Sequence, residues 1–119
     1  MKYFSKSISR LSRKKELREF DIDVEVNPRL PQSFNERGNK RLSVGNYHGA
    51  LEDFSKAVEL NPTYSIHIFN CGVAKFYLID YKGAIDEFSK AISLKPLNDG
   101  YYFNRGVAKC ASGNVAGGI

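Results

Sequence analysis

The chain has 119 residues, of which 42% are hydrophobic and 26% charged, a composition typical of one soluble globular domain. No apolar run reaches the roughly 20 residues that a membrane-spanning helix needs, and the two cysteines, Cys71 and Cys110, are too few for a disulfide framework. The formal net charge of +5 is concentrated in residues 1–20, which carry seven basic and two acidic residues, so a nucleic-acid-binding domain is not indicated.

The N-terminal arm allows more than one interpretation. Phe4, Ile8 and Leu11 share one helical face among basic residues, as in a targeting segment or a helix that binds a membrane surface or nucleic acid. The alternatives are a solvated tail or the first helix of a degraded repeat. These readings concern the arm alone, and we expect a cytoplasmic protein with no transmembrane segment.

Residues 13–26 are predicted to form the second helix of this degraded repeat, because residues 14–28 align with residues 48–62. The aligned pairs are Leu17/Leu51, Phe20/Phe54, Val24/Val58 and Pro28/Pro62. A strand is the competing prediction, since apolar and acidic residues alternate between Phe20 and Val26.

A 34-residue repeat dominates the remainder of the chain. Residues 45–62 recur at 79–96, and the segment before them recurs three times in alignment with Gly38, Gly72 and Gly106. Shared residues are Tyr47/Tyr81, Gly49/Gly83, Ala50/Ala84, Phe54/Phe88, Ala57/Ala91 and Pro62/Pro96. Apolar spacing predicts helices at roughly 31–45, 47–60, 64–78, 81–94 and 98–112, with a turn at Gly113-Asn114 and fraying over residues 113–119.

The glycines at 38, 72 and 106 fall in the middle of predicted helices. Glycine there costs about 1 kcal/mol relative to alanine, which a helix accepts where another backbone must come close. Small alanines on the partner helix allow the same approach, and Phe54 and Phe88 are predicted to fill the space between helices.

This pattern resembles the tetratricopeptide repeat. The resemblance implies an all-α solenoid of two full repeats, 31–64 and 65–98, with partial repeats at 1–30 and 99–119. Three features depart from the usual pattern. Arg41, Lys75 and Lys109 stand where a tyrosine is usual, Ile79 replaces a turn glycine, and Gly118 stands where alanine is expected.

The resemblance also implies protein–protein interaction through a concave groove lined by the first helix of each repeat. The predicted groove residues are Asn35, Asn39, Phe69, Asn70, Val73, Tyr77, Phe103, Asn104 and Val107. Asparagines at one end and apolar or aromatic residues at the other favour a scaffold or adaptor that binds an apolar or mixed peptide, or a partner helix. Phe69 and Phe76 could instead pack within the helical stack.

Chaperone-binding members of the family hold a C-terminal carboxylate with two asparagines and three basic residues. Asn39 and Asn70 match the asparagines, whereas the basic positions are occupied by Asn35, Gly100 and Asn104. We therefore expect no tight binding of an acidic chaperone tail. Self-association through the apolar C-terminal helix is a second possible interaction.

No motif indicates an enzyme, a cofactor, a metal site or a small-molecule substrate. His48 and His67 are expected to face solvent, and Cys71 is expected to be an inert core thiol with Cys110 exposed. The acidic residues of the second helices are predicted to form a solvated face; they are Glu52, Asp53, Asp86 and Glu87.

Overall fold

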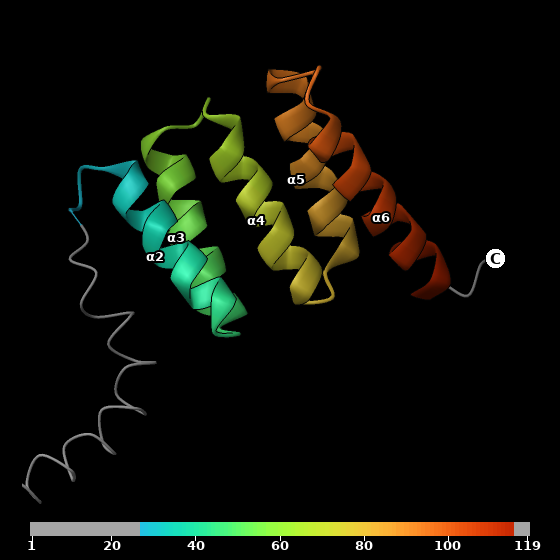
Figure 1. Cartoon of the computed structure of the whole chain (residues 1–119), viewed down its shortest axis with the longest axis horizontal. Coiled ribbons are helices and arrows are strands. Elements are labelled where there is room, and N and C mark those ends of the chain that lie inside the picture. Colours follow the sequence, from blue (N-terminus) through green and yellow to red (C-terminus); the bar gives the residue numbers. More distant parts are fainter. Residues whose placement is uncertain (1–26, 116–119) are drawn as a thin grey trace, which may run out of the picture.

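The computed structural model describes residues 27–115, and these residues form five α-helices without a strand. The helices are α2 (Pro31–Ser43), α3 (Tyr47–Leu60), α4 (Ser65–Tyr77), α5 (Tyr81–Leu94) and α6 (Asp99–Val115) (Figure 1). The predicted all-α repeat fold is confirmed. The N-terminal arm and the helix predicted at 13–26 lie outside the described residues.

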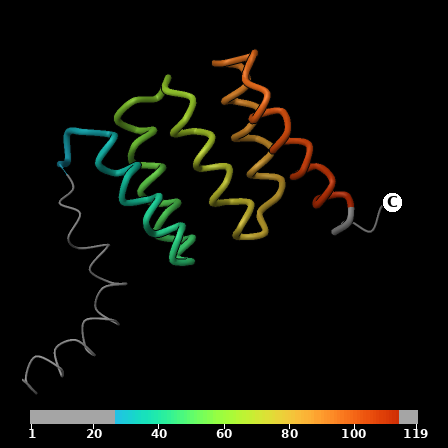
Figure 2. The backbone as a smooth tube through the Cα atoms, in the orientation of Figure 1, coloured from blue at the N-terminus to red at the C-terminus, as the bar shows by residue number. Residues whose placement is uncertain are grey.

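The five helices form a two-layered array in which each helix packs against the next one along the chain. Figures 1 and 2 show α2, α4 and α6 in one layer, with α3 and α5 behind them. Because consecutive helices run in opposite directions, the first helices of successive repeats are parallel and share one surface. All nine predicted groove residues lie on these first helices.

A glycine on the first helix of each complete hairpin lies directly under a phenylalanine of the second helix. A Cβ atom built on Gly38 would stand 2.6 Å from Cε1 of Phe54, and one built on Gly72 would stand 2.6 Å from Cε1 of Phe88. Both rings are buried. A side chain at either glycine would therefore push the helices apart, which explains why the helix accepts glycine at these positions.

Buried contacts connect the two hairpins and α6. The half-buried side chain of Val58 packs against both the cluster around Phe54 and the cluster around Ile68. Phe69 in turn contacts the cluster around Ile68 and the one around Phe88. A buried hydrogen bond of 2.9 Å joins the hydroxyl oxygens of Ser65 and Tyr101, and it links the start of α4 to the start of α6.

The two turns inside the hairpins have the same geometry. The amides of Asn46 and Asp80 each donate to the carbonyl five residues earlier, as in the Schellman motif at a helix C-terminus. This motif requires a left-handed residue, which is Gly45 in the first turn (φ 86°) and Ile79 in the second (φ 66°). Asn46 and Asp80 then cap the following helices through side-chain oxygens, which accept from the backbone N–H groups three residues later at 3.0 Å.

The turn predicted at Gly113-Asn114 is not formed. The helix α6 continues through both residues to Val115, so the expectation of fraying from residue 113 is also wrong for residues 113–115. At Gly45 and Ile79 the chain turns because the next helix is capped and packed against its predecessor. No helix follows α6 within the described residues, so the backbone of 113–115 continues its intrahelical hydrogen bonding.

The left-handed conformation of Ile79 leads to a stability prediction. Left-handed backbone costs a β-branched residue roughly 1–2 kcal/mol, and this side chain is 64% exposed, so little buried surface is lost on its removal. After allowance for the flexibility of glycine in the unfolded chain, Ile79→Gly is expected to raise the free energy of unfolding by about 1 kcal/mol in urea denaturation.

The reciprocal substitution at the first turn is the matched control. Gly45→Ile is expected to lower the free energy of unfolding by about the same amount, since no atom crowds a Cβ at residue 45 and only its positive φ opposes a side chain. Equal stabilities for the wild type and both variants would contradict this account of the turns.

Candidate functional site

The polar end of the groove surface is built by asparagines on α2 and α4. The side-chain nitrogen of Asn70 donates a hydrogen bond of 2.7 Å to the side-chain oxygen of Asn35, which ties the two helices together. Asn39 lies one turn further along α2 and is exposed. The two bonded amides keep further hydrogen-bonding capacity, because the amide nitrogen of Asn35 is a donor and the oxygen of Asn70 is an acceptor.

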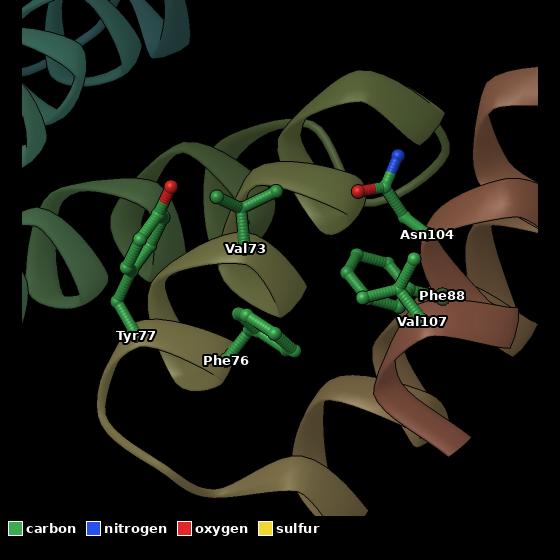
Figure 3. Close-up of a pocket in the computed structure, with 6 residues that line it drawn as sticks. All are labelled: Val73, Phe76, Tyr77, Phe88, Asn104 and Val107. Atoms are coloured by element: carbon green, nitrogen blue, oxygen red, sulfur yellow. The ribbon is translucent and has the colours of Figure 1, made fainter. Parts of the chain in front are cut away.

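The apolar end of the surface contains a hollow of about 90 Å³ between α4 and α6. Its lining consists of Val73, Phe76 and Tyr77 from α4, Phe88 from α5, and Asn104 and Val107 from α6 (Figure 3). Ligand pockets for small molecules measure roughly 300–1,000 Å³. The hollow is therefore suited to one apolar side chain rather than to a whole small molecule.

Two residues at the edge of this hollow combine an apolar and a polar character. Tyr77 is 50% exposed, and its ring is stacked on the ring of Tyr47 with the centroids 5.0 Å apart. The side-chain nitrogen of Asn104 donates to the carbonyl oxygen of Gly100 at 2.8 Å. Figure 3 shows its side-chain oxygen turned toward the hollow. The edge of the hollow thus presents a supported aromatic ring on one side and an amide on the other.

The three phenylalanines singled out in the sequence occupy different environments. Phe69 is half-buried between the rings of Phe88 and Tyr101, at centroid distances of 5.3 and 4.9 Å, so it packs within the stack. Phe76 lines the hollow and also contacts Tyr77 and Tyr81. Phe103 is 70% exposed. The sequence predicted Phe88 only as a core residue, but its side chain also lines the hollow. A repeat pattern does not give the spacing between α4 and α6 on which this second role depends.

A second, more polar hollow of about 420 Å³ lies beside the asparagine pair. It is lined by Pro31, Gln32, Asn35, Asn61, Tyr64, Ile66 and His67. The expectation that His67 faces solvent is wrong, because its side chain is buried against Tyr64 with the ring centroids 4.7 Å apart. The repeat contained a signal of this burial, because the equivalent residue 34 positions later is the aromatic Tyr101, which is also buried.

The buried imidazole of His67 is an unusual feature of this hollow. Its Nδ1 atom has no hydrogen-bond partner among residues 27–115. Burial lowers the pKa of His67 because the charged imidazolium loses its hydration. His48 is exposed, as predicted.

The acidic residues of the second helices are not a uniform solvated face. Glu52 and Asp86 are exposed, but Asp53 is buried and accepts bonds from Arg37 at 2.9 Å, with Arg41 at 3.3 Å. Asp53 is buried because Arg41, which stands where the repeat usually has a tyrosine, requires an acid on the facing helix.

The second hairpin contains the equivalent pair, Lys75 with Glu87 at 2.7 Å. Burial tends to lower the pKa of Lys75, but the hydrogen bond from Lys75 to Glu87 and the charge of that carboxylate raise it by more. Lys75 and Glu87 therefore form a charged pair between α4 and α5.

The cysteines occupy the environments predicted for them. Cys71 is buried and Cys110 is exposed. Burial raises the pKa of the Cys71 thiol to about 11, so the thiol is protonated at neutral pH and is a weak nucleophile. Across residues 27–115, no cluster of three metal-ligating side chains forms, and no helix is long and apolar enough to cross a membrane.

Comparison with known proteins identifies the repeat and the fold. Residues 31–64 match the family model of the tetratricopeptide repeat, so this segment is a tetratricopeptide repeat. The structure is similar to the first TPR domain of human RPAP3, with a TM-score of 0.76 and 17% sequence identity over 97% of this chain and 91% of that domain. The described chain therefore has the fold of a TPR domain.

Two further solved structures are similar at comparable levels. The first TPR of Spaghetti (RPAP3), bound to the HSP90 peptide SRMEEVD, gives a TM-score of 0.72 and 19% identity over 90% of this chain and 85% of that one. MamA gives a TM-score of 0.73 and 20% identity over 82% of this chain, and the match covers only 57% of the MamA chain. The search of curated proteins gave no match.

The buried His67 leads to a prediction about pH. In the unfolded chain a histidine takes up a proton below about pH 6.5, whereas the folded protein takes it up only at lower pH because its pKa is lowered. The unfolded state then binds more protons, so stability falls as the pH drops below about 6.5, by at most about 1.4 kcal/mol per pH unit from this residue.

Urea denaturation of the wild type and of His67→Phe at pH 7.5 and 5.5 measures this effect. The variant is expected to lose less stability between the two pH values than the wild type. His48→Gln, which removes the exposed imidazole, is the matched control and should behave like the wild type. Identical losses for the wild type and His67→Phe would show that His67 does not contribute.

Proposed function

We propose that the chain is a protein-interaction module, and that the groove across α2, α4 and α6 binds a peptide or helix of a partner protein. The hollow beside Tyr77 carries the proposal, because it is an apolar depression of one-side-chain size on the surface that the first helices share. An apolar residue of the partner would enter this hollow, while the partner's polar groups would bond to the asparagines at the other end.

The physical chemistry of the hollow suits an interface anchor. Tyr77 is held by Tyr47 and Phe76, so little side-chain entropy remains to be lost when a partner covers its exposed half. Val73 and Val107 offer apolar surface on opposite helices, and its removal from water favours binding by about 25 cal/mol per Å². Aromatic residues in such positions are typical hot spots of protein interfaces.

We assign this groove a binding role and not a catalytic one. General acid or base catalysis needs a titratable group within reach of the substrate. Among the residues that line the hollow, the phenol of Tyr77 is the one titratable group, and no carboxylate, imidazole, thiol or amine stands beside it. Asp53 and Glu87 are held by basic residues between the two helices of their hairpins.

The groove favours an apolar or mixed partner over an acidic one. The structure of Spaghetti (RPAP3) holds a peptide that ends in EEVD. In this chain the positions that would supply the cationic part of a carboxylate clamp are Asn35, Gly100 and Asn104. Amides bond to a carboxylate but do not compensate its charge, and charge-assisted bonds are roughly twice as strong as neutral ones.

The peptide SRMEEVD therefore tests the charge argument. Titration of the peptide into the protein, followed by calorimetry, is expected to show a Kd weaker than about 100 µM. Asn35→Lys with Asn104→Arg would restore two cations and is expected to strengthen binding by about tenfold or more. Micromolar affinity of the unaltered chain would refute the prediction.

The proposed groove itself is tested with peptides selected against the protein from a displayed random library. The selected peptides are expected to share an apolar residue, and Tyr77→Ala combined with Asn70→Ala should weaken their binding about 30-fold or more in fluorescence polarisation. The loss arises because the substitutions remove both the supported ring and one amide of the Asn35–Asn70 pair.

A matched double substitution on the opposite layer controls for general effects. Lys82→Ala with Asp86→Ala changes two exposed residues of α5 and should leave affinity unaltered. Circular dichroism melting of both double variants separates loss of folding from loss of binding. Selected peptides that bind the Tyr77/Asn70 variant as tightly as the wild type would place their site elsewhere.

A further inference from the structure

The helix α6 carries a notch that is filled in the two complete hairpins. Gly38 and Gly72 lie under Phe54 and Phe88, as described above. Gly106 occupies the equivalent position on α6, but a Cβ built there would meet no atom of the described residues within 4 Å. The helix α6 thus has the recess that receives a second helix, and within residues 27–115 the recess is open.

The same face of α6 carries positive charge at equivalent positions. In the first hairpin Arg37 and Arg41 bind the carboxylate of Asp53, and in the second Lys75 binds that of Glu87. On α6 the corresponding basic residues are Arg105 and Lys109.

Neither of these α6 residues has a carboxylate partner recorded in the part of the chain that the structure describes. Arg105 donates to the hydroxyl of Ser89 at 3.2 Å, and Lys109 is exposed. A helix that covers this face should therefore carry an acid opposite Lys109 and a phenylalanine over Gly106. In both complete hairpins these two residues are adjacent, as Asp53-Phe54 and Glu87-Phe88.

The chain contains a third segment with this pattern, outside the described residues. Glu19-Phe20 stands 34 positions before Asp53-Phe54, and Leu17, Val24 and Pro28 stand 34 positions before Leu51, Val58 and Pro62. Residues 14–26 therefore combine the phenylalanine, the adjacent acid and the apolar spacing that the open face of α6 requires.

We propose that residues 14–26 of one copy of the chain dock on α6 of another copy as the second helix of its third repeat. Phe20 would fill the notch at Gly106, and Glu19 would bind Lys109. The contact joins two different surfaces, so repetition of the same contact links chains head to tail, as a closed ring or an open array.

A second copy is required, because the segment cannot reach α6 of its own chain. Residues 27–30 form a turn at the start of α2, closed by a hydrogen bond of 3.0 Å from the amide of Leu30 to the carbonyl of Asn27. Figure 1 places α2 and α6 at opposite ends of the described array, with α4 between them. Helix axes pack about 8–10 Å apart, so the gap is on the order of 20 Å, and a turn of four residues does not span it.

The inference does not depend on the proposed peptide groove. Lys109 and Gly106 lie on the face of α6 equivalent to the one that α3 and α5 cover on α2 and α4. Asn104 and Val107 instead line the hollow between α4 and α6. Docking of a second copy therefore leaves the groove accessible, and either property can fail without the other.

Sedimentation velocity of the 119-residue chain from about 5 to 200 µM tests the proposal. The wild type is expected to show an average mass that rises with concentration above the 13.4 kDa of the monomer. Phe20→Ala and Gly106→Leu should each weaken association about 30-fold or more, because the first removes the inserted ring and the second fills its recess.

Mixing the two variants distinguishes a head-to-tail contact from other modes of association. Phe20→Ala retains an intact α6, and Gly106→Leu retains an intact N-terminal segment, so an equimolar mixture should form a dimer and no larger species. A mixture that stays monomeric, or wild-type chain that is monomeric at about 200 µM, would overturn the proposal.

Charge reversal provides a test that does not depend on how Gly106→Leu folds. Glu19→Lys and Lys109→Glu should each weaken association, by about fivefold or more. The two variants mixed together should recover it, because both contacts between unlike variants then pair a lysine with a glutamate. Lys82→Glu, which reverses an exposed charge on α5, is the matched control and should associate like the wild type. Association that none of these variants alters would assign the contact to another surface and refute the proposal.

Discussion

The fold depends on the contact between a phenylalanine ring and a glycine backbone. At Gly38 and Gly72 the absence of a Cβ lets the second helix of each hairpin approach until the ring of Phe54 or Phe88 covers the first helix. Alanines at 50, 57, 84 and 91 are fully buried on the second helices and allow the same approach. Because this spacing repeats every 34 residues, the first helices of successive hairpins meet along one surface, on which the proposed binding groove lies.

The sequence predicted the helices well because their spacing is set by local patterns. The observed bounds of α2 to α5 differ from the predicted ones by at most two residues, since Pro31, Asn46, Asp80 and the turn residues give clear start and stop signals. The end of α6 was mispredicted because the chain leaves the helix at Gly113 only if another helix packs after it. No helix follows α6 among residues 27–115. A repeat pattern identifies a residue's place in the unit, but the neighbouring helix decides its conformation.

The candidate site was less predictable, because it depends on partners from other helices. The expectation that Val73 and Tyr77 share a groove-facing side of α4 came from the resemblance to the tetratricopeptide repeat. The hollow between them and Val107 required the distance from α4 to α6. The burial of Asp53 was missed for a similar reason. A carboxylate on an amphipathic helix normally faces water, and only the arrangement of Arg37 and Arg41 on the adjoining helix makes its burial favourable.

The hydrogen bond between Asn35 and Asn70 has a consequence for any chain laid along the groove. It uses the oxygen of one amide and a proton of the other, so the surface offers the donor of Asn35 on α2 and the acceptor of Asn70 on α4. A backbone peptide group also has one donor and one acceptor, on opposite edges. A peptide group that bridges this pair would point its carbonyl oxygen toward α2 and its N–H toward α4. The asparagine pair therefore fixes which edge of a bridging peptide group faces each helix, in either N-to-C direction of the guest.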